Sequence, residues 1–218
     1  MEEKYFKTKE GVAEYERAEE INTQYNLDML ESAGVHLKDL KGKKVLDIGC
    51  AFGGLLNEFE KAGASCFGID ISEFAIKRCR ERFPSIKAEI ADSINIPFSE
   101  KFDLIVCFGT LGLVKKEEHQ KTLENIYNSL SSGGRFVGNA PNAKRPYLMD
   151  IVTGRKKSAS YDNARTAEEW KEILFEARFD RIRVSPVLRL PLSKKILRKN
   201  IFLKTFSGDP IEISARRN

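Results

Sequence analysis

The first 142 residues alternate between short apolar runs and longer amphipathic stretches. The apolar runs predict strands over 43–49, 65–71, 86–92, 102–108 and 135–141. The stretches between them predict helices over 55–63, over 72–83 with Ser72 as its N-cap, and over 115–134. The run over 102–108 is nearly continuous in apolar residues, which is typical of a central parallel strand. This alternation predicts an α/β fold, in which a doubly wound and mostly parallel sheet carries helices on both faces.

The two ends of the chain depart from the alternation. Residues 8–33 predict a long helix with a loose apolar stripe among charged positions. After residue 142, a polar stretch precedes a helix expected over 166–179, where Thr166 and Glu169 form a capping box. Two further strands are expected at 181–188 and 210–217, and a basic segment separates them.

Composition narrows the class of protein. With 41% hydrophobic residues, no long apolar run and a charged N-terminal stretch, the chain predicts a globular protein without a membrane span or secretory signal. Four cysteines without a CxxC pair, and only two histidines, predict a reducing cytoplasm and no metal site. Residues 144–218 hold 18 basic against 9 acidic side chains. That excess suits nucleic acid, an anionic small substrate or a solvated surface, and the solvated surface is the default interpretation.

Three acids stand where successive predicted strands end. Gly49 and Gly53 remove Cβ atoms at a strand-to-helix turn next to Asp47, and Asp70 and Asp92 close the next two strands. In an open α/β sheet, ligands bind beyond the carboxyl ends of the strands. A carboxylate placed like that of Asp70 suits a pair of ribose hydroxyls, because it can accept two hydrogen bonds. The sequence therefore predicts a ligand site at this edge of the sheet.

The order of these residues resembles that of the class I S-adenosylmethionine-dependent methyltransferases, in particular their small-molecule branch. The resemblance covers residues 40–142 and rests on the run 47–53, then Asp70, then Asp92, then the run 102–105. It implies S-adenosyl-L-methionine as the cofactor and a seven-stranded sheet whose last strand is antiparallel. It further implies one methyltransferase domain over 1–218, with a helical cap at 1–40, a cofactor-binding core at 41–142, and a substrate-side region with the closing strands at 143–218.

The resemblance also implies a role for individual positions. Asp47 would fix the turn, and the two glycines would let the cofactor pass the chain. Asp70 would hold the ribose hydroxyls, Ile71 would pack on the adenine, and Asp92 would accept a hydrogen bond from the adenine amino group. The expected cofactor-binding residues are Asp47, Gly49, Cys50, Ala51, Gly53, Asp70, Ile71, Asp92, Ser93, Cys107, Phe108 and Gly109.

Three alternatives stay open beside a small-molecule methyltransferase. A nicotinamide enzyme would need G-x-G-x-x-G after the first strand, whereas C-A-F-G follows Gly49. A non-catalytic cofactor-binding homologue is suggested by Ala51, where the family usually has glycine, although one added methyl group is expected to leave binding intact. An RNA-directed enzyme is the third, but the [D/N/S]-P-P-[Y/F] tetrad of amino-group nucleic-acid methyltransferases is missing at 107–110.

The substrate side is less defined, and no catalytic base is identified. The candidates for substrate contact are Asn139, Asn142, Tyr147 and Tyr161. His119 lies in a predicted helix rich in Lys and Glu, so we expect it to be exposed rather than catalytic, and Trp170 is expected in the core. The basic segment 189–204 is expected to form a packed flap near the substrate mouth. The function expected is therefore methyl transfer to an O, N or C nucleophile of a small substrate, with an acidic molecule favoured over RNA.

Overall fold

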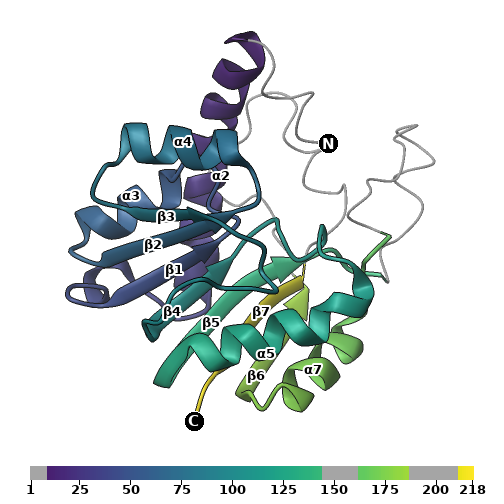
Figure 1. The fold of residues 1–218 in the computed structure, drawn as a ribbon. Coiled ribbons are helices and arrows are strands. Elements are labelled where there is room, and N and C mark those ends of the chain that lie inside the picture. Colours follow the sequence, from purple (N-terminus) through teal and green to yellow (C-terminus); the bar gives the residue numbers. More distant parts are fainter. Residues whose placement is uncertain (1–8, 144–161, 187–210) are drawn as a thin grey trace, which may run out of the picture.

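A seven-stranded sheet forms the centre of the computed structural model, which describes residues 9–143, 162–186 and 211–218 (Figure 1). The strands are β1 Lys44–Ile48, β2 Ser65–Asp70, β3 Lys87–Ile90, β4 Phe102–Cys107, β5 Leu130–Ala140, β6 Asp180–Pro186 and β7 Ile211–Arg216. Their order is β3-β2-β1-β4-β5-β7-β6, and β7 runs antiparallel to both of its neighbours. The neighbouring pairs among β1 to β5 are parallel. The expected mostly parallel sheet with an antiparallel last strand is confirmed.

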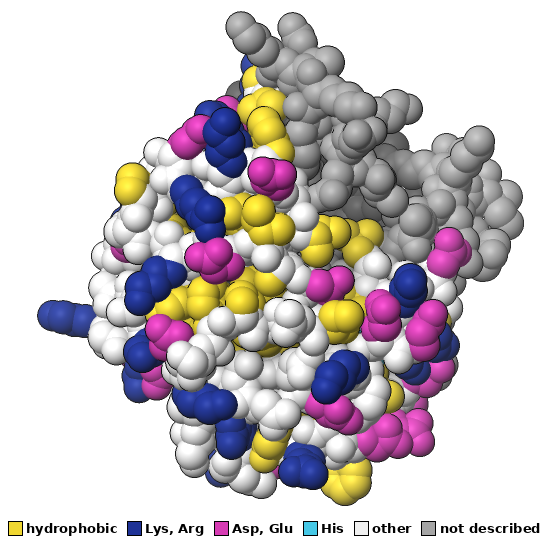
Figure 2. Space-filling view, viewed as in Figure 1, with side chains coloured by type: hydrophobic (Ala, Val, Ile, Leu, Met, Phe, Trp, Pro, Cys, Tyr) yellow, Lys and Arg dark blue, Asp and Glu magenta, His cyan; other side chains and the backbone are white. Residues whose placement is uncertain are grey.

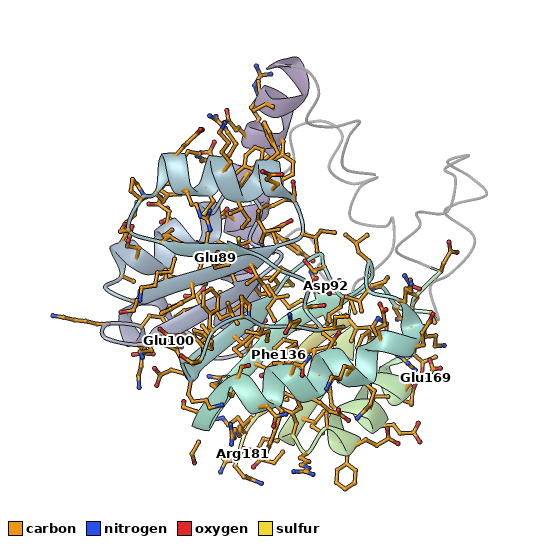
Figure 3. All side chains as sticks on the ribbon, in the orientation of Figure 1. Glu89, Asp92, Glu100, Phe136, Glu169 and Arg181 are labelled. Carbon is orange, nitrogen blue, oxygen red and sulfur yellow. The ribbon has the colours of Figure 1, made fainter. Side chains whose placement is uncertain are left out.

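Helices cover both faces of this sheet (Figure 1). On one face lie α2 Lys9–Ser32, α3 Gly54–Lys61 and α4 Glu73–Arg82, and on the other lie α5 His119–Ser129 and α7 Ala167–Glu176. Short 3-10 turns occupy η1 Leu37–Asp39 and η2 Lys116–Glu118. Because side chains alternate along a strand, the central strands β1, β2, β4 and β5 supply both cores. In β1, Val45 packs with the α2–α4 layer and Leu46 with the α5–α7 layer, and in Figure 3 Phe136 of β5 lies between the sheet and α5.

The helix expected over 115–134 is shorter than predicted. α5 ends at Ser129, and β5 begins at Leu130. Gly133 and Gly134 do not end the helix, because they belong to an irregularity in the pairing of β4 with β5, where the register shifts between Phe102 and Leu104. A Cβ on Gly134 would lie only 2.9 Å from the carbonyl oxygen of Phe102, so close approach of two backbones requires this glycine.

Both predicted helix starts that rest on a side-chain cap are confirmed. Ser72 Oγ accepts from the Ala75 amide at 3.1 Å at the start of α4. Thr166 and Glu169 form the reciprocal capping box at the start of α7. Trp170 lies in the core, as expected, with no exposed surface.

Several sequence predictions fall on positions that the structure does not describe. Tyr147, Tyr161 and the basic segment 189–204 lie outside the described residues. Within the described ranges, no helix is both long and apolar enough to cross a membrane.

Candidate active site

The carboxyl ends of β1, β2 and β4 lie at one edge of the sheet, where the strand order reverses. β1 lies between β2 and β4 in the centre of the sheet. Doubly wound proteins bind ligands beyond the strand ends at such a point, and we call this edge, with Asp47, residues 49–53 and Asp70, the crevice. The turn from β1 to α3, residues 49–53, lies at this crevice. Figure 3 shows Asp92 at the same edge, while Glu100 lies toward the opposite ends of the strands.

The glycine turn is held by backbone hydrogen bonds and by the side chain of Asp70. The amides of Gly49 and Cys50 both donate to the Ile69 carbonyl, at 2.8 and 3.0 Å. The Ala51 amide donates to Asp70 Oδ2 at 3.0 Å. Asp70 Oδ1 accepts from the Ser72 amide at 2.9 Å, so one carboxylate fixes both the turn and the start of α4. The sequence did not indicate this structural role of Asp70.

The two glycines of the turn are needed for the protein's own packing. Gly49 and Gly53 have φ values of 81° and 84°, in the region that favours glycine. A Cβ on Gly49 would lie 1.9 Å from Thr110 Oγ1, and one on Gly53 would lie 2.6 Å from Cys79 Sγ. That a cofactor passes beside these glycines stays a prediction. The close approaches of Thr110 and Cys79 are a separate reason for glycine at both positions.

Ala51 adopts a left-handed backbone conformation, with φ of 49°. This conformation costs a non-glycine residue about 1–2 kcal/mol. Glycine would remove this strain but would lose about 0.5–1 kcal/mol of conformational entropy on folding. We therefore expect Ala51→Gly to keep or slightly raise the free energy of unfolding in urea. Ala75→Gly, inside α4, is expected to lower the free energy of unfolding. An equal loss of stability at both positions would show that the Ala51 backbone is not strained.

Asp47 is a buried carboxylate on the α2–α4 side of β1. It is 5% exposed, and no hydrogen bond or ion pair from another described residue neutralises it. Burial, followed by the charges of Asp70 and Glu19, raises the pKa of Asp47 to about 8. The site therefore holds a carboxylate that is deprived of water and faces other acids, an environment that favours a proton or a cationic ligand.

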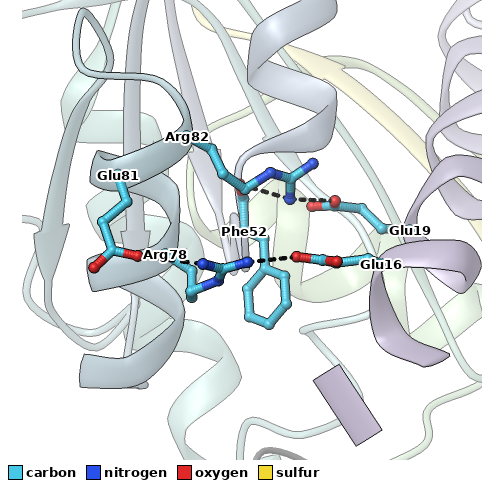
Figure 4. Close-up of polar contacts among 6 residues, drawn as sticks. All are labelled: Glu16, Glu19, Phe52, Arg78, Glu81 and Arg82. Carbon is cyan, nitrogen blue, oxygen red and sulfur yellow. Dashed lines mark hydrogen bonds and ion pairs between the residues drawn. The ribbon is translucent and has the colours of Figure 1, made fainter. Parts of the chain in front are cut away.

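Glu19 is the acid of the site that sequence reasoning missed. It comes from α2, and its Oε1 accepts from the Gly54 amide at 3.0 Å. Its other oxygen, Oε2, lies 2.6 Å from Arg82 Nη1 (Figure 4). In the sequence, Glu19 is one of many charged residues on a helix. One feature of the sequence points to such a partner. Gly53 and Gly54 supply no side chain to cap the start of α3, so its first amides need an acceptor from elsewhere in the chain.

Apolar surface lies beside the acids. Ile71, which follows β2, is 62% exposed, and Phe74 and Leu113 are the other exposed large hydrophobic side chains that follow β2 and β4. Figure 2 shows other hydrophobic side chains across the middle of the face in view, between charged groups. An exposed isoleucine directly after a strand-end carboxylate places an apolar contact next to a hydrogen-bond acceptor, which suits a nucleoside.

The other predicted cofactor residues fall into two groups. Asp92 lies two residues past β3 rather than at its end, and its Oδ1 accepts from Ser93 Oγ and from the Ile94 amide, both at 3.1 Å. At the end of β4, Cys107 is fully buried, Phe108 is buried, and the Gly109 amide donates to Asn139 Oδ1 at 2.7 Å. The last of these hydrogen bonds places Asn139 next to Gly109.

The substrate-side candidates are only partly described. Asn139 is engaged with Gly109, and Asn142 forms a backbone bridge with Arg165. Both asparagines lie at the carboxyl end of β5, as expected from the sequence. No group of three metal-ligating side chains exists within the described ranges.

The prediction that His119 is exposed is wrong. His119 is fully buried at the start of α5, and its ring packs 4.7 Å from that of Trp170. Nδ1 accepts from Arg165 Nε at 3.0 Å, so Nε2 carries the proton and donates to the Leu111 carbonyl at 2.9 Å. Burial, aided by the charge of Arg165, lowers the pKa of His119. His119 therefore holds the loop after β4, and neither ring nitrogen is available to a substrate.

Comparisons with known proteins agree with this geometry. The chain is 33% identical over 120 residues to a ubiquinone biosynthesis O-methyltransferase of Coxiella burnetii, covering 52% of this chain and 50% of that protein. It is 32% identical over 128 residues to an mRNA cap guanine-N(7) methyltransferase of Candida glabrata, covering 47% of this chain and 30% of that protein. The chain thus spans about half the length, or less, of the curated relatives it matches.

A solved structure shares the fold over nearly the whole chain. The plantazolicin methyltransferase BamL, in complex with a triazolic desmethylPZN analog and SAH, superposes with a TM-score of 0.71 at 16% identity, covering 99% of this chain and 94% of that one. A family model described as a methyltransferase domain matches residues 39–196, more than half of the chain. The chain belongs to this methyltransferase-domain family.

Proposed function

We propose that the protein transfers a methyl group from S-adenosylmethionine to an O, N or C nucleophile of a small molecule. The observation that carries this proposal is the acidic crevice at the carboxyl ends of β1 and β2, where Asp47 and Asp70 lie beside the exposed Ile71. Membership of a methyltransferase-domain family supports the same activity. The solved and curated proteins that the chain resembles are methyltransferases, and several of the structures contain S-adenosylmethionine or its demethylated product.

The residues present suit this cofactor. S-adenosylmethionine, when bound, supplies a methyl group on a positively charged sulfonium, and its amino acid part adds an ammonium group. A buried and uncompensated Asp47 would gain from a nearby cation. A carboxylate such as that of Asp70 can accept several hydrogen bonds at once, which suits ribose hydroxyls. Ile71 would contact the adenine.

The chain's own contribution is to bind, align and exclude water. A methyl group on a sulfonium is already activated, so a fixed approach of the nucleophile supplies much of the acceleration. The backbone from Cys107 to Thr110, held by the Gly109–Asn139 bond, would form the wall beside the reacting atoms. His119 does not act as a base, because both of its nitrogens are engaged.

An RNA acceptor is the second candidate. The likeness to an mRNA cap methyltransferase and the excess of basic residues in 144–218 favour it. The small molecule is preferred because, among the described large hydrophobic side chains that follow β2 and β4, Phe74 is the one exposed aromatic ring, whereas successive bases stack on several. The basic segment lies outside the described residues.

Calorimetry followed by a label-transfer screen tests the proposal. We expect binding of S-adenosylmethionine and its demethylated product but not of nicotinamide dinucleotides, and transfer of radiolabelled methyl to a compound in metabolite pools. Tight dinucleotide binding without binding of the sulfonium cofactor would contradict the proposal. Transfer to bulk RNA, with binding that weakens by orders of magnitude between low and moderate salt, would make RNA the acceptor.

A further inference from the structure

The first turn of α3 has no cap from its own sequence. Its N-cap residue is Gly53, and its first turn contains no acidic side chain. The first amides of a helix lack intrahelical partners and carry a partial positive charge of roughly half a unit. In α/β proteins such a helix start, facing the carboxyl edge of the sheet, is a ready binding site for an anion.

In this chain a carboxylate from α2 already occupies that position. Glu19 Oε1 accepts from the Gly54 amide at 3.0 Å, and the Glu19 side chain is only 10% exposed. A Cβ on Gly54 would lie 2.8 Å from Glu19 Cδ, so glycine at position 54 is what allows this close approach. A ligand phosphate would have to displace Glu19.

Two ion pairs join α2 to α4 beside the glycine turn (Figure 4). Glu19 pairs with Arg82 at 2.6 Å, and Arg82 Nη1 also lies 3.4 Å from the Phe52 carbonyl. One turn earlier on α2, Glu16 pairs with Arg78 at 2.7 Å. Within the part of the chain that the structure describes, no hydrogen bond or ion pair joins Glu16 to the glycine turn. The two glutamates therefore hold α2 to α4 in similar ways, but only Glu19 contacts the turn.

Glu19 also shapes the charge of the crevice. Asp70 from β2 and Glu19 from α2 interact electrostatically with Asp47. Two further titratable groups, Tyr15 of α2 and Cys50 of the turn, feel the charges of the same cluster. Arg82 of α4 is the cation paired with this set. Among the described residues, even with a proton on Asp47, Arg82 offsets only one of the negative charges of Asp70 and Glu19, so the crevice attracts a positively charged ligand more than a neutral one.

Resting on the proposed function, we propose that Glu19 is a specificity-determining residue of the cofactor site. Its carboxylate fills the anion site at the start of α3 and favours the sulfonium-bearing methyl donor over the demethylated product, whose sulfur carries no charge. After transfer, loss of the positive charge would remove this attraction and promote release of the product.

The test compares Glu19→Gln with the matched control Glu16→Gln by calorimetry with donor and product. Glutamine keeps an acceptor for the Gly54 amide but removes the charge. We expect the preference for donor over product to fall by about fivefold in Glu19→Gln and to stay within about twofold of wild type in Glu16→Gln. The pH midpoint of donor binding should also move to lower pH, because Asp47 loses a neighbour that raises its pKa.

A variant with the opposite sign separates charge from packing. Arg82→Gln removes the cation and leaves Glu19 ionised, so we expect the preference for the donor to increase. Equal weakening of donor and product in Glu19→Gln, or a fall of the preference in Arg82→Gln, would show that Glu19 only holds the turn and would overturn the inference. A wild-type protein that binds neither ligand would instead contradict the proposed function.

Discussion

Asp47→Asn is expected to stabilise the cofactor-free protein at pH 8.5 by several kcal/mol while it weakens binding of S-adenosylmethionine by about tenfold or more. In the folded protein, Asp47 is buried beside Asp70 and Glu19, and its pKa is raised to about 8. In the unfolded chain the carboxyl group returns to a pKa of about 4. The wild-type protein therefore keeps a buried charge at high pH that asparagine does not have.

The sign of the pH dependence follows from these two values. Between pH 4 and pH 8, folded Asp47 holds a proton that the unfolded chain has released, so stability falls as pH rises, on the order of 1.4 kcal/mol per pH unit. Asp47→Asn removes this slope. The difference between variant and wild type should therefore vanish near pH 4 and be largest above pH 8.

Binding should show the complementary dependence. A cationic cofactor prefers ionised Asp47, so the affinity of the wild type should rise with pH up to about 8, whereas that of Asp47→Asn should stay flat. Urea unfolding and calorimetry across this range measure both effects, and Asp39→Asn, at an exposed aspartate, serves as the control. An Asp47→Asn protein that is less stable than wild type at pH 8.5 would show that the carboxylate is a structural acceptor.

The parts of the molecule that follow local rules could be predicted from the sequence. Apolar runs gave the strands, because a central parallel strand is buried on both faces. The caps at Ser72 and Thr166 were identifiable because capping depends on residues within one turn. The clustering of Asp47 and Asp70 was also predictable, since neighbouring parallel strands bring their carboxyl ends together.

Contacts between distant segments could not be predicted in this way. His119 lies in a Lys- and Glu-rich stretch, and its burial depends on Trp170 and Arg165, about 50 residues away in sequence. Glu19 caps a helix that begins 35 residues later. Gly133 and Gly134 were read as a helix end because local sequence does not distinguish a helix stop from a β-bulge.

Asp70 shows how the structure changes an expectation based on function alone. A role in ribose binding alone predicts that removing this carboxylate weakens cofactor binding and leaves the stability of the cofactor-free protein unchanged. The structure shows Asp70 bonded to the amides of Ala51 and Ser72 at 3.0 and 2.9 Å. Asp70→Ala would leave both partly buried donors without this acceptor.

We therefore expect Asp70→Ala to lower the free energy of unfolding without ligand by about 2–4 kcal/mol, and cofactor affinity by about 1–3 kcal/mol, because charged acceptors are lost in both cases. Asp70→Ala also removes a negative charge that repels ionised Asp47, and this offsets part of the loss of stability at high pH. Asp70→Asn retains one acceptor oxygen, so its loss of stability should be smaller.

The control for the ligand role is Ser72→Ala, which removes the cap of α4 and leaves the Asp70 carboxylate in place. Ser72→Ala should cost about 1 kcal/mol of stability with cofactor affinity nearly unchanged. If Asp70→Asn loses stability but binds S-adenosylmethionine like the wild type, Asp70 only braces the turn. If Asp70→Asn loses more binding free energy than free energy of unfolding, and Ser72→Ala binds normally, the Asp70 carboxylate both fixes the turn and contacts the cofactor.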